Sequence, residues 1–308
     1  MNLLATRGVL RRGAAAVQEH AAEGGPPDLG EMLMHHLSDS NVIEFGFLGW
    51  SWERELPVWE PLFSLGPVTV DLSPTKHSVF MFLAAILLLL VFLPIGRAMR
   101  GKSDRAPKGL ANAMEAMVLF FRDEVVRRNI GHGADVYTSF ILTLFFFILS
   151  MNLLGLVPFA ATPTGNLSVT GALALVTFCV TEISGMRQLG FKGYMGTIFY
   201  APPGMGRFGT GMMLMIMTPV EFLGKLTKPF ALMIRLFANM TAGHTLVLSL
   251  IGMIFLFANL TYGKWVIAGA SLGMVLAVMM LELFVAFLQA YIFAMLSAVF
   301  IGLIRHPH

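Results

Sequence analysis

The amino-acid sequence predicts an all-α integral membrane protein. Five helices are expected to cross the membrane, an amphipathic helix to lie on the cytoplasmic surface, and the last two helices to form a long, steeply tilted hairpin. Of the 308 residues, 56% are hydrophobic and 13% are charged, whereas soluble domains carry about 25% charged residues. The mean hydropathy is +0.74, and the apolar residues fall in runs that reach the ~20 residues needed to span a bilayer.

The first 67 residues are predicted to be an extramembrane N-terminal region, followed by a membrane domain from residue 68 to 308. The Arg-rich start has no apolar core typical of a signal peptide, which leaves an organelle transit segment as an alternative. Three of the four tryptophans and a row of acids lie between Leu29 and Leu72, as expected near a membrane interface. Val68–Val70 has the composition of a short strand. His35 and His36 have no Cys or acidic partner at metal-ligand spacing, so we expect no metal site.

Three helices are expected to cross the membrane before residue 190: Val79–Ile95, Val136–Val157 and Leu167–Ser184. Five basic residues follow the first, between Arg97 and Lys108. They place its end in the cytoplasm and the N-terminus outside. The segment Leu110–Arg128 is amphipathic, with Met114, Met117, Val118, Phe121 and Val125 on one face, and is interpreted as the cytoplasmic surface helix.

The connections of the third span follow from their composition. Ala161–Asn166 predicts a tight external turn, and the Gly/Pro-rich stretch Gly190–Arg207 predicts a cytoplasmic connection. Near the end of this span, Glu182 is expected to pair with Arg187.

The last hundred residues contain two apolar runs that are longer than a membrane span. Thr210–Leu260 and Val266–Ile304 exceed 20 residues, and a helix of 39 residues would reach roughly 58 Å against a hydrocarbon core of ~30 Å. An ordinary tilt of ~20° cannot absorb that excess. The sequence therefore predicts a steeply inclined hairpin that turns at Asn259–Lys264, with Gly269 and Gly273 allowing close approach. The C-terminus falls in the cytoplasm.

Arg235 is the most unusual residue of this hairpin. An arginine near the middle of a membrane helix costs at least ~2.5–3.5 kcal/mol. An arginine that snorkels to the lipid surface is the alternative. However, about 25 apolar-biased residues follow Arg235, and Lys225 and Lys228 already mark the polar boundary before it. We therefore interpret Arg235 as a functional intramembrane cation.

Two pairs of polar residues fall at equal depth if the hairpin is antiparallel. Arg235 and Gln289 have their midpoint at position 262, and His244 and Glu282 have theirs at 263. Both midpoints lie in the turn, which was predicted from composition alone. His244 and Glu282 should therefore face each other on the outer side of Arg235.

Two further residues share roughly the face of Arg235. Asn239 follows one turn later, and Glu221 lies 14 residues before, roughly 21 Å along the helix. Titratable groups at staged depths are what a proton path through a membrane needs.

Each of these residues also has a structural interpretation. For His244 and Glu282 the alternative is an ion pair that only joins two helices. Gln289 can be a simple interhelical hydrogen-bond donor, Asn239 a cap of a local backbone distortion, and Glu221 a solvated partner of Lys225. Asp71 and His77, at the outer mouth of the first helix, either help protons to enter or are merely solvated.

Four stretches resemble subunit a of the F-type ATP synthases, between about Val68 and Ile304. They are Asn152–Pro158 (NLLGLVP), Glu221 with Lys228-Pro229, Arg235–His244 (RLFANMTAGH), and Glu282 with Gln289–Phe293 (QAYIF).

The resemblance implies a role for each matching residue. Arg235 would face the carboxylate of each passing subunit c and prevent a proton short circuit. Asn239 and Gln289 match the family's asparagine and glutamine, and Glu221 matches the acid of its cytoplasmic half-channel. Many bacterial members carry an acid after the Ala-Gly pair and a histidine on the last helix. Here His244 and Glu282 are exchanged, as in the mitochondrial form, which supports a contact between them.

The function expected from the resemblance is that of a non-catalytic, proton-conducting stator subunit without cofactors. Protons would enter near Asp71, pass His244 and Glu282, load the c-ring and leave past Glu221. The expected partners are the c-ring, the stator helices of subunit b and membrane lipid. No nucleic-acid partner is expected, and a bacterial inner membrane is the expected location. A proton-coupled secondary transporter is the alternative, although no inverted repeat is present. A non-conducting structural subunit would leave Arg235 unexplained.

Overall fold

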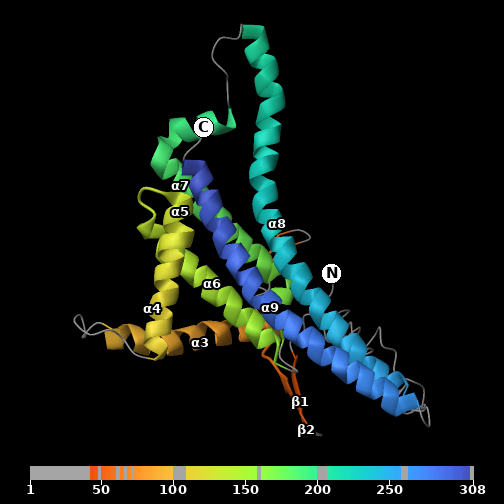
Figure 1. Cartoon of the computed structure of the whole chain (residues 1–308). Helices are drawn as coiled ribbons and strands as arrows, with labels where there is room; N and C mark the ends of the chain where they lie inside the picture. The colour runs from red at the N-terminus through yellow and green to blue at the C-terminus, as the bar shows by residue number, and fades with distance from the viewer. Residues whose placement is uncertain are drawn as a thin grey trace. The chain divides into compact units, whose positions relative to one another are not determined.

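The computed structural model describes residues 42–47, 50–59, 63–65, 68–70, 73–99, 109–157, 161–199, 207–257 and 263–305, which are mostly helical (Figure 1). The chain divides into two compact units. The first contains Met1–Phe82, Leu153–Gly165 and Ala238–Val285. The second contains Leu83–Asn152, Asn166–Phe237 and Ala286–His308.

Five helices in the described ranges are long and apolar enough to cross a membrane, which confirms the predicted number. The last two have 50 and 43 residues. At ~1.5 Å per residue they reach roughly 75 and 64 Å, about twice the hydrocarbon core. Their length is therefore as predicted, and their tilt stays a prediction. The five helices are α3 (Lys76–Met99), α6 (Asp135–Gly155), α7 (Leu167–Ile198), α8 (Arg207–Leu256) and α9 (Gly263–Arg305).

The N-terminal part of the first unit forms two small antiparallel sheets. Strand β1 (Val42–Phe47) pairs with β2 (Trp50–Glu55), and β3 (Phe63–Leu65) pairs with β4 (Val68–Val70). The strand predicted at Val68–Val70 is confirmed. The other three strands were not predicted.

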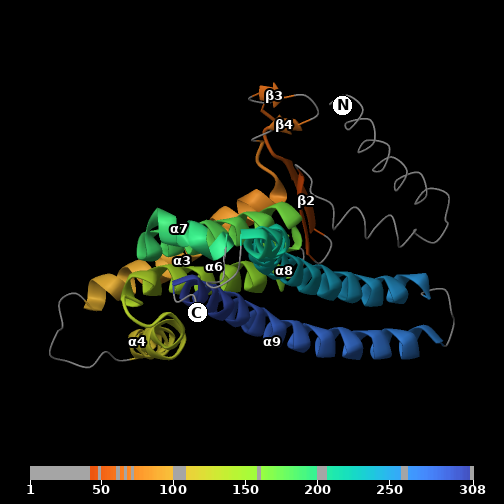
Figure 2. The same ribbon diagram turned by 90° about the horizontal axis from the view of Figure 1, so that it is seen from above.

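The remainder of the first unit is built around the hairpin of α8 and α9. Residues 238–256 of α8 and 263–285 of α9 run side by side in opposite directions (Figure 2). Their connection lies largely outside the described residues, at 258–262. The close approach predicted at Gly269 and Gly273 is wrong, since a Cβ at either position would meet no described atom within 4 Å. Gly243, by contrast, packs closely against Glu282.

The second unit is held together by helices that pack on α6 and on the end of α9. Phe121 packs on Phe145 of α6, with ring centroids 4.5 Å apart, and on Tyr291 of α9 at 6.1 Å. Buried Asn152 donates from Nδ2 to the carbonyl oxygen of Ala286 at 3.3 Å. Because helix backbones in lipid satisfy their own hydrogen bonds, such a side-chain bond adds specificity to an apolar contact.

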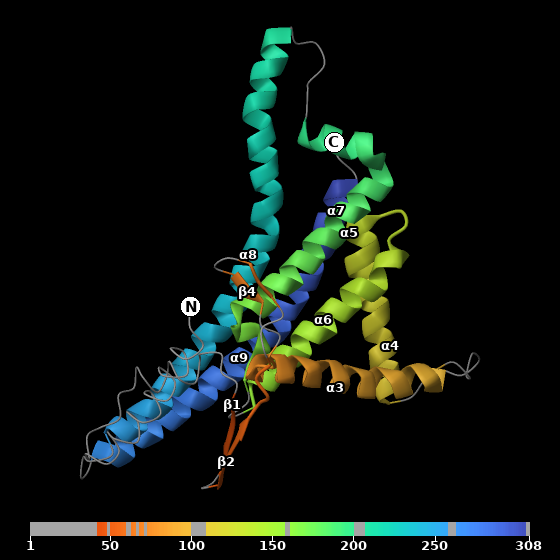
Figure 3. The ribbon, with the colours of Figure 1, turned by 180° about the vertical axis from the view of Figure 1, so that it is seen from behind.

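The segment predicted as one amphipathic helix has three parts. It contains α4 (Leu110–Phe120), a π-helical segment η1 (Phe121–Arg127) and α5 (Arg128–Ile130). Phe121 and Val125 of the predicted apolar face are buried, although against other helices of the unit. The chain then turns back, so that η1 and α6 lie side by side (Figure 3).

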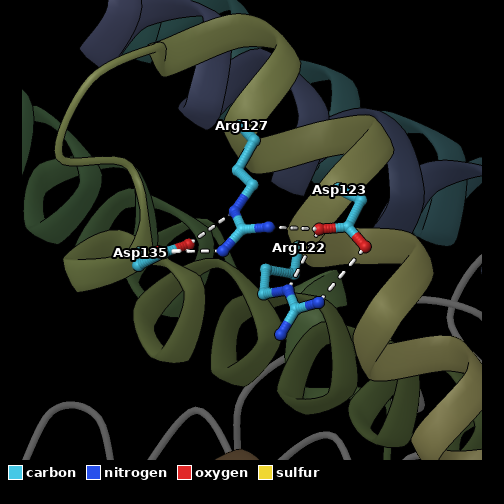
Figure 4. A network of polar contacts seen from close by, with 4 residues as sticks. All are labelled: Arg122, Asp123, Arg127 and Asp135. Carbon is cyan, nitrogen blue, oxygen red and sulfur yellow. Dashed lines mark hydrogen bonds and ion pairs between the residues drawn. The ribbon is translucent and has the colours of Figure 1, made fainter.

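Charged residues join the two sides of this turn. Arg127 holds Asp135, the first residue of α6, through two parallel bonds of 2.8 and 3.0 Å, and it reaches Asp123 at 2.9 Å (Figure 4). Arg122 donates to Asp123 as well, at 3.0 Å. All these side chains are largely exposed, so their contribution to stability is small.

Helix α7 is longer than the predicted third span, and it is bent. It continues beyond Ser184 to Ile198, through the stretch predicted as a connection, and Gly190 interrupts it with φ 70° and ψ 163°. Only glycine adopts this backbone conformation without strain. Figure 1 shows the change of direction near the end of α7. At its start, the Asn166 side chain accepts a hydrogen bond from the backbone N–H of Ser168 at 2.8 Å and so caps the helix.

Arg305, the last residue of α9, contacts several other parts of the second unit. Its guanidinium donates from Nη2 to the carbonyl oxygen of His132 at 2.9 Å and to the amide oxygen of Gln188 at 3.0 Å. It also lies over the ring of Tyr137, 5.5 Å from the centroid. Arg305 is buried. One side chain therefore links α9 to α7 and to the turn before α6.

Candidate functional site

Arg235 lies on the outer side of α8 within the second unit. Its neighbours Leu232 and Leu236 are buried, whereas Arg235 is exposed. Among the described residues, none forms an ion pair or a hydrogen bond with the side chain of Arg235. A cation on an apolar helix, uncompensated by the part of the chain that is described, is suited to meet an anion from outside the chain.

Gln289, predicted at the depth of Arg235, points to the packed side of α9. It is 2% exposed and lies between the fully buried residues Ala286 and Phe293. The side-chain amide of Gln289 is therefore enclosed within the second unit. The predicted equality of depth stays a prediction, because no contact joins the two residues.

The predicted facing of His244 and Glu282 stays a prediction, although the first unit brings Glu282 to the residue next to His244. Glu282 is buried, and its carboxyl group lies against Gly243, which directly precedes His244. A Cβ at position 243 would be 2.7 Å from the carboxyl carbon of Glu282. The register that was predicted from the position of the turn therefore pairs stretches of α8 and α9 that are in contact in the structure.

Thr162 also belongs to this cluster, and sequence reasoning missed it. Its hydroxyl forms a hydrogen bond with Nε2 of His244, and the same side chain packs on Gly155 at the end of α6. Thr162 is buried. It lies within the predicted external turn, where a threonine gives no signal of its own. Only the fold brings it to a histidine 82 residues further along the chain.

The other predicted residues have different outcomes. Asn239 is exposed on a helix that is continuous from Arg207 to Leu256, so it caps no break in the backbone. His77 is 6% exposed, so the solvated alternative is wrong for it. Asp71, His35 and His36 lie outside the described residues.

Glu221 lines a cavity of about 630 Å³ within the second unit. Residues of α7 on both sides of its bend, the first half of α8 and the last turns of α9 form its walls. Lys225 and Lys228 line it as well, together with Glu182. The cavity therefore combines two carboxylates and two ammonium groups with apolar walls.

The pairing of Glu182 differs from the prediction. Instead of Arg187, which is exposed, Glu182 contacts Tyr194 and Lys225. The Tyr194 hydroxyl donates to Oε2 of Glu182, and Nζ of Lys225 lies 3.8 Å from the same oxygen. The bend at Gly190 explains the error, because a straight helix would keep Tyr194 far from Glu182. Lys225 is thus the partner of Glu182, and the alternative that pairs Lys225 with Glu221 is not observed among the described residues.

Comparison with known proteins identifies one family along most of the chain. The family model described as "ATP synthase A chain" matches residues 78–302. The "ATP synthase subunit a" of Anaeromyxobacter dehalogenans (strain 2CP-C) is 46% identical, over 95% of this chain and 78% of the relative. That of Chlorobium phaeobacteroides (strain BS1) is also 46% identical, over 92% and 79%. The "ATP synthase subunit a 2" of Prosthecochloris aestuarii is 43% identical, over 98% and 89%.

Proposed function

This chain belongs to the ATP synthase A-chain family, and on that premise we propose that its polar residues form two offset half-channels that load and unload protons on the c-ring. Family membership makes it a non-catalytic proton-channel subunit of the Fo membrane sector. The alternatives of a secondary transporter and a non-conducting subunit are therefore not retained. The roles of individual residues are proposals argued from the geometry.

The observation that carries the proposal is the exposed guanidinium of Arg235, which has no ion-pair or hydrogen-bond partner within the described ranges. A rotor carboxylate that passes close to this cation is favoured in its ionised form, because an opposite charge stabilises a carboxylate. A protonated site cannot pass Arg235 without losing its proton. The loaded site must therefore travel the long way round through lipid, which couples proton flow to rotation.

The outer half-channel would use Asp71, His244 and Glu282. The burial of Glu282 beside Gly243 and the Thr162 hydroxyl at His244 support a relay in which an acid and a base exchange a proton. Thr162 would orient the imidazole, since a hydrogen bond at one ring nitrogen fixes the tautomer.

The inner half-channel would end at Glu221. The cavity around Glu221 is large enough to hold several water molecules, each of which takes up about 30 Å³ in the liquid. Asn239 and Gln289 would flank the cation and help to position it. In this proposal the N-terminus would lie outside the cell and the C-terminus in the cytoplasm of a bacterium. The c-ring would face Arg235, and the helices of subunit b would contact another face.

The test replaces Arg235 with alanine in the complete ATP synthase. The variant should lose coupled ATP synthesis in energised membrane vesicles, because protons could then pass without rotation. Arg128→Ala, at an exposed arginine paired with Glu124, controls for the loss of a positive charge. Synthesis by Arg235→Ala at the rate of Arg128→Ala would disprove the assignment.

A further inference from the structure

The cavity around Glu221 has a polar wall that the proposed path does not use. Glu182 and Lys225 lie in this wall, with side chains that are only 12% and 11% exposed. An ion pair this far removed from water is expensive to build. The pair lines the same cavity as Glu221, the neighbouring acid.

The bend of α7 builds the pair. Tyr194 follows Glu182 by 12 residues, which in a straight helix would separate the two by about 18 Å. Gly190, with its positive φ, turns the chain so that the Tyr194 hydroxyl reaches the Glu182 carboxylate. The last turns of α7 thus fold back over the cavity and present a donor to Glu182.

Three contacts then hold Lys225 on the side of α7. Nζ lies 3.8 Å from Oε2 of Glu182, donates to Oγ1 of Thr197 at 3.3 Å, and sits 4.3 Å from the ring centroid of Tyr194. A salt bridge, a hydrogen bond and a cation–π contact all draw the ammonium in one direction. The ammonium group of Lys225 is therefore bound to α7 in this structure.

Glu221 would otherwise be the natural partner of Lys225. It lies one helical turn earlier on α8, and a glutamate four residues before a lysine is the favourable order for a pair. The charged groups that line the cavity with Glu221 are Glu182 from α7 and Lys225 and Lys228 from α8, while α9 contributes Phe300, Leu303 and Ile304. Tyr194 of α7 contacts Glu182 and Lys225. Lys228 lies 5.7 Å from the ring centroid of Phe300. Among the described residues, none forms an ion pair with Glu221.

We propose that Glu182 is a positioning residue of the inner half-channel, which holds Lys225 on α7 and so keeps Glu221 free of a cationic partner and able to exchange protons. A carboxylate paired with an ammonium favours its ionised form and takes up a proton less readily. Held apart from Lys225, the Glu221 carboxyl group has no ion-pair partner among the described residues and is accessible to a proton from the cavity. The inference rests on the proposed role of Glu221 as the inner proton-exchanging group.

The experiment measures ATP-driven proton pumping by the complete synthase in inverted membrane vesicles. In this direction Glu221 must take protons from the medium, so pumping falls as the medium becomes alkaline. In Glu182→Gln, Lys225 is released toward Glu221, and the alkaline fall should move about one pH unit lower. Lys225→Gln should keep the fall at the wild-type pH, and Glu182→Gln/Lys225→Gln should return it there. ATPase activity with an uncoupler and the amount of assembled complex normalise every rate.

The outcomes separate the inference from its premise. The positioning role is overturned if pumping by Glu182→Gln falls at the wild-type pH, or if the double variant keeps the shifted pH. The ion pair would then only join α7 to α8. Equal shifts in Glu182→Gln and Lys225→Gln would do the same. If Glu182→Gln does not assemble, Glu182→Asp is used instead, because its shorter side chain keeps the negative charge but moves it away from Lys225. The pH at which pumping falls must then shift in the same direction by a smaller amount. Glu221→Gln should lose most pumping, and normal pumping by that variant would instead refute the proposed role of Glu221.

Discussion

The contact between Gly243 and Glu282 allows the relay to be tested without removing a charge. In Gly243→Ala, the new Cβ would stand 2.7 Å from the carboxyl carbon of Glu282, whereas ordinary contacts begin at 3.4 Å. The new Cβ would also overlap Oε1 of the same carboxyl group, so this group must move by more than about 0.7 Å. Since a misplacement of about 1 Å in a reacting group can cost roughly 10²-fold in rate, proton pumping should fall by about tenfold or more.

The stability of the helix should not fall in the same variant. Alanine in a helix interior is about 0.5–1 kcal/mol more favourable than glycine, and the obstructing atoms belong to the end of a flexible side chain. Gly273→Ala on α9 is the matched control, because a Cβ there meets no described atom within 4 Å. The assay compares ATP-driven pumping per assembled complex in membrane vesicles. If both variants pump equally well, the placement of Glu282 beside His244 is irrelevant to proton flow and the relay argument is wrong.

Three further predictions concern the relay, the bend and the exposed charge cluster. The exchange His244→Glu with Glu282→His should pump protons better than either single variant, and if both single variants pump normally, the pair is no relay. Gly190→Ala should destabilise the subunit by roughly 1–3 kcal/mol through backbone strain, seen as earlier thermal loss of the assembled complex than in Gly196→Ala, where a Cβ meets open space among the described residues. Asp123 accepts a hydrogen bond from Arg122, which lowers its pKa. The ionised carboxylate therefore stabilises the fold above its ordinary pKa, and this gain is lost as the pH falls through the lowered value. The thermal stability of wild type should exceed that of Asp123→Asn at neutral pH and approach it below about pH 4, and a constant difference would contradict this.

Hydropathy and spacing were sufficient to predict the spans and one contact of the site. Apolar runs predict the five helices because a bilayer requires about 20 apolar residues in a row. The contact between α9 and the stretch before His244 followed from the antiparallel register, since both helices rise equally per residue. The unusual length of α8 and α9 followed from the same counting.

The errors have one physical origin, which is backbone geometry that composition does not encode. Gly190 was interpreted as the start of a connection, but it is a bend inside a continuing helix. Because Tyr194 returns to Glu182 only through that bend, the partner of Glu182 was predicted from sequence proximity and was wrong. Thr162 was missed for a related reason, since its partner lies far along the chain. Gly269 and Gly273 show the converse, because small residues permit close packing without requiring it.

The position of Arg305 has a consequence for biogenesis. The carbonyl oxygen of His132 and the amide oxygen of Gln188 accept hydrogen bonds from Arg305, which is synthesised more than a hundred residues later. Helices α6 and α7 must therefore enter the bilayer and persist there while this end of their unit is still incomplete. This end of the unit can therefore form only after Arg305 has been synthesised.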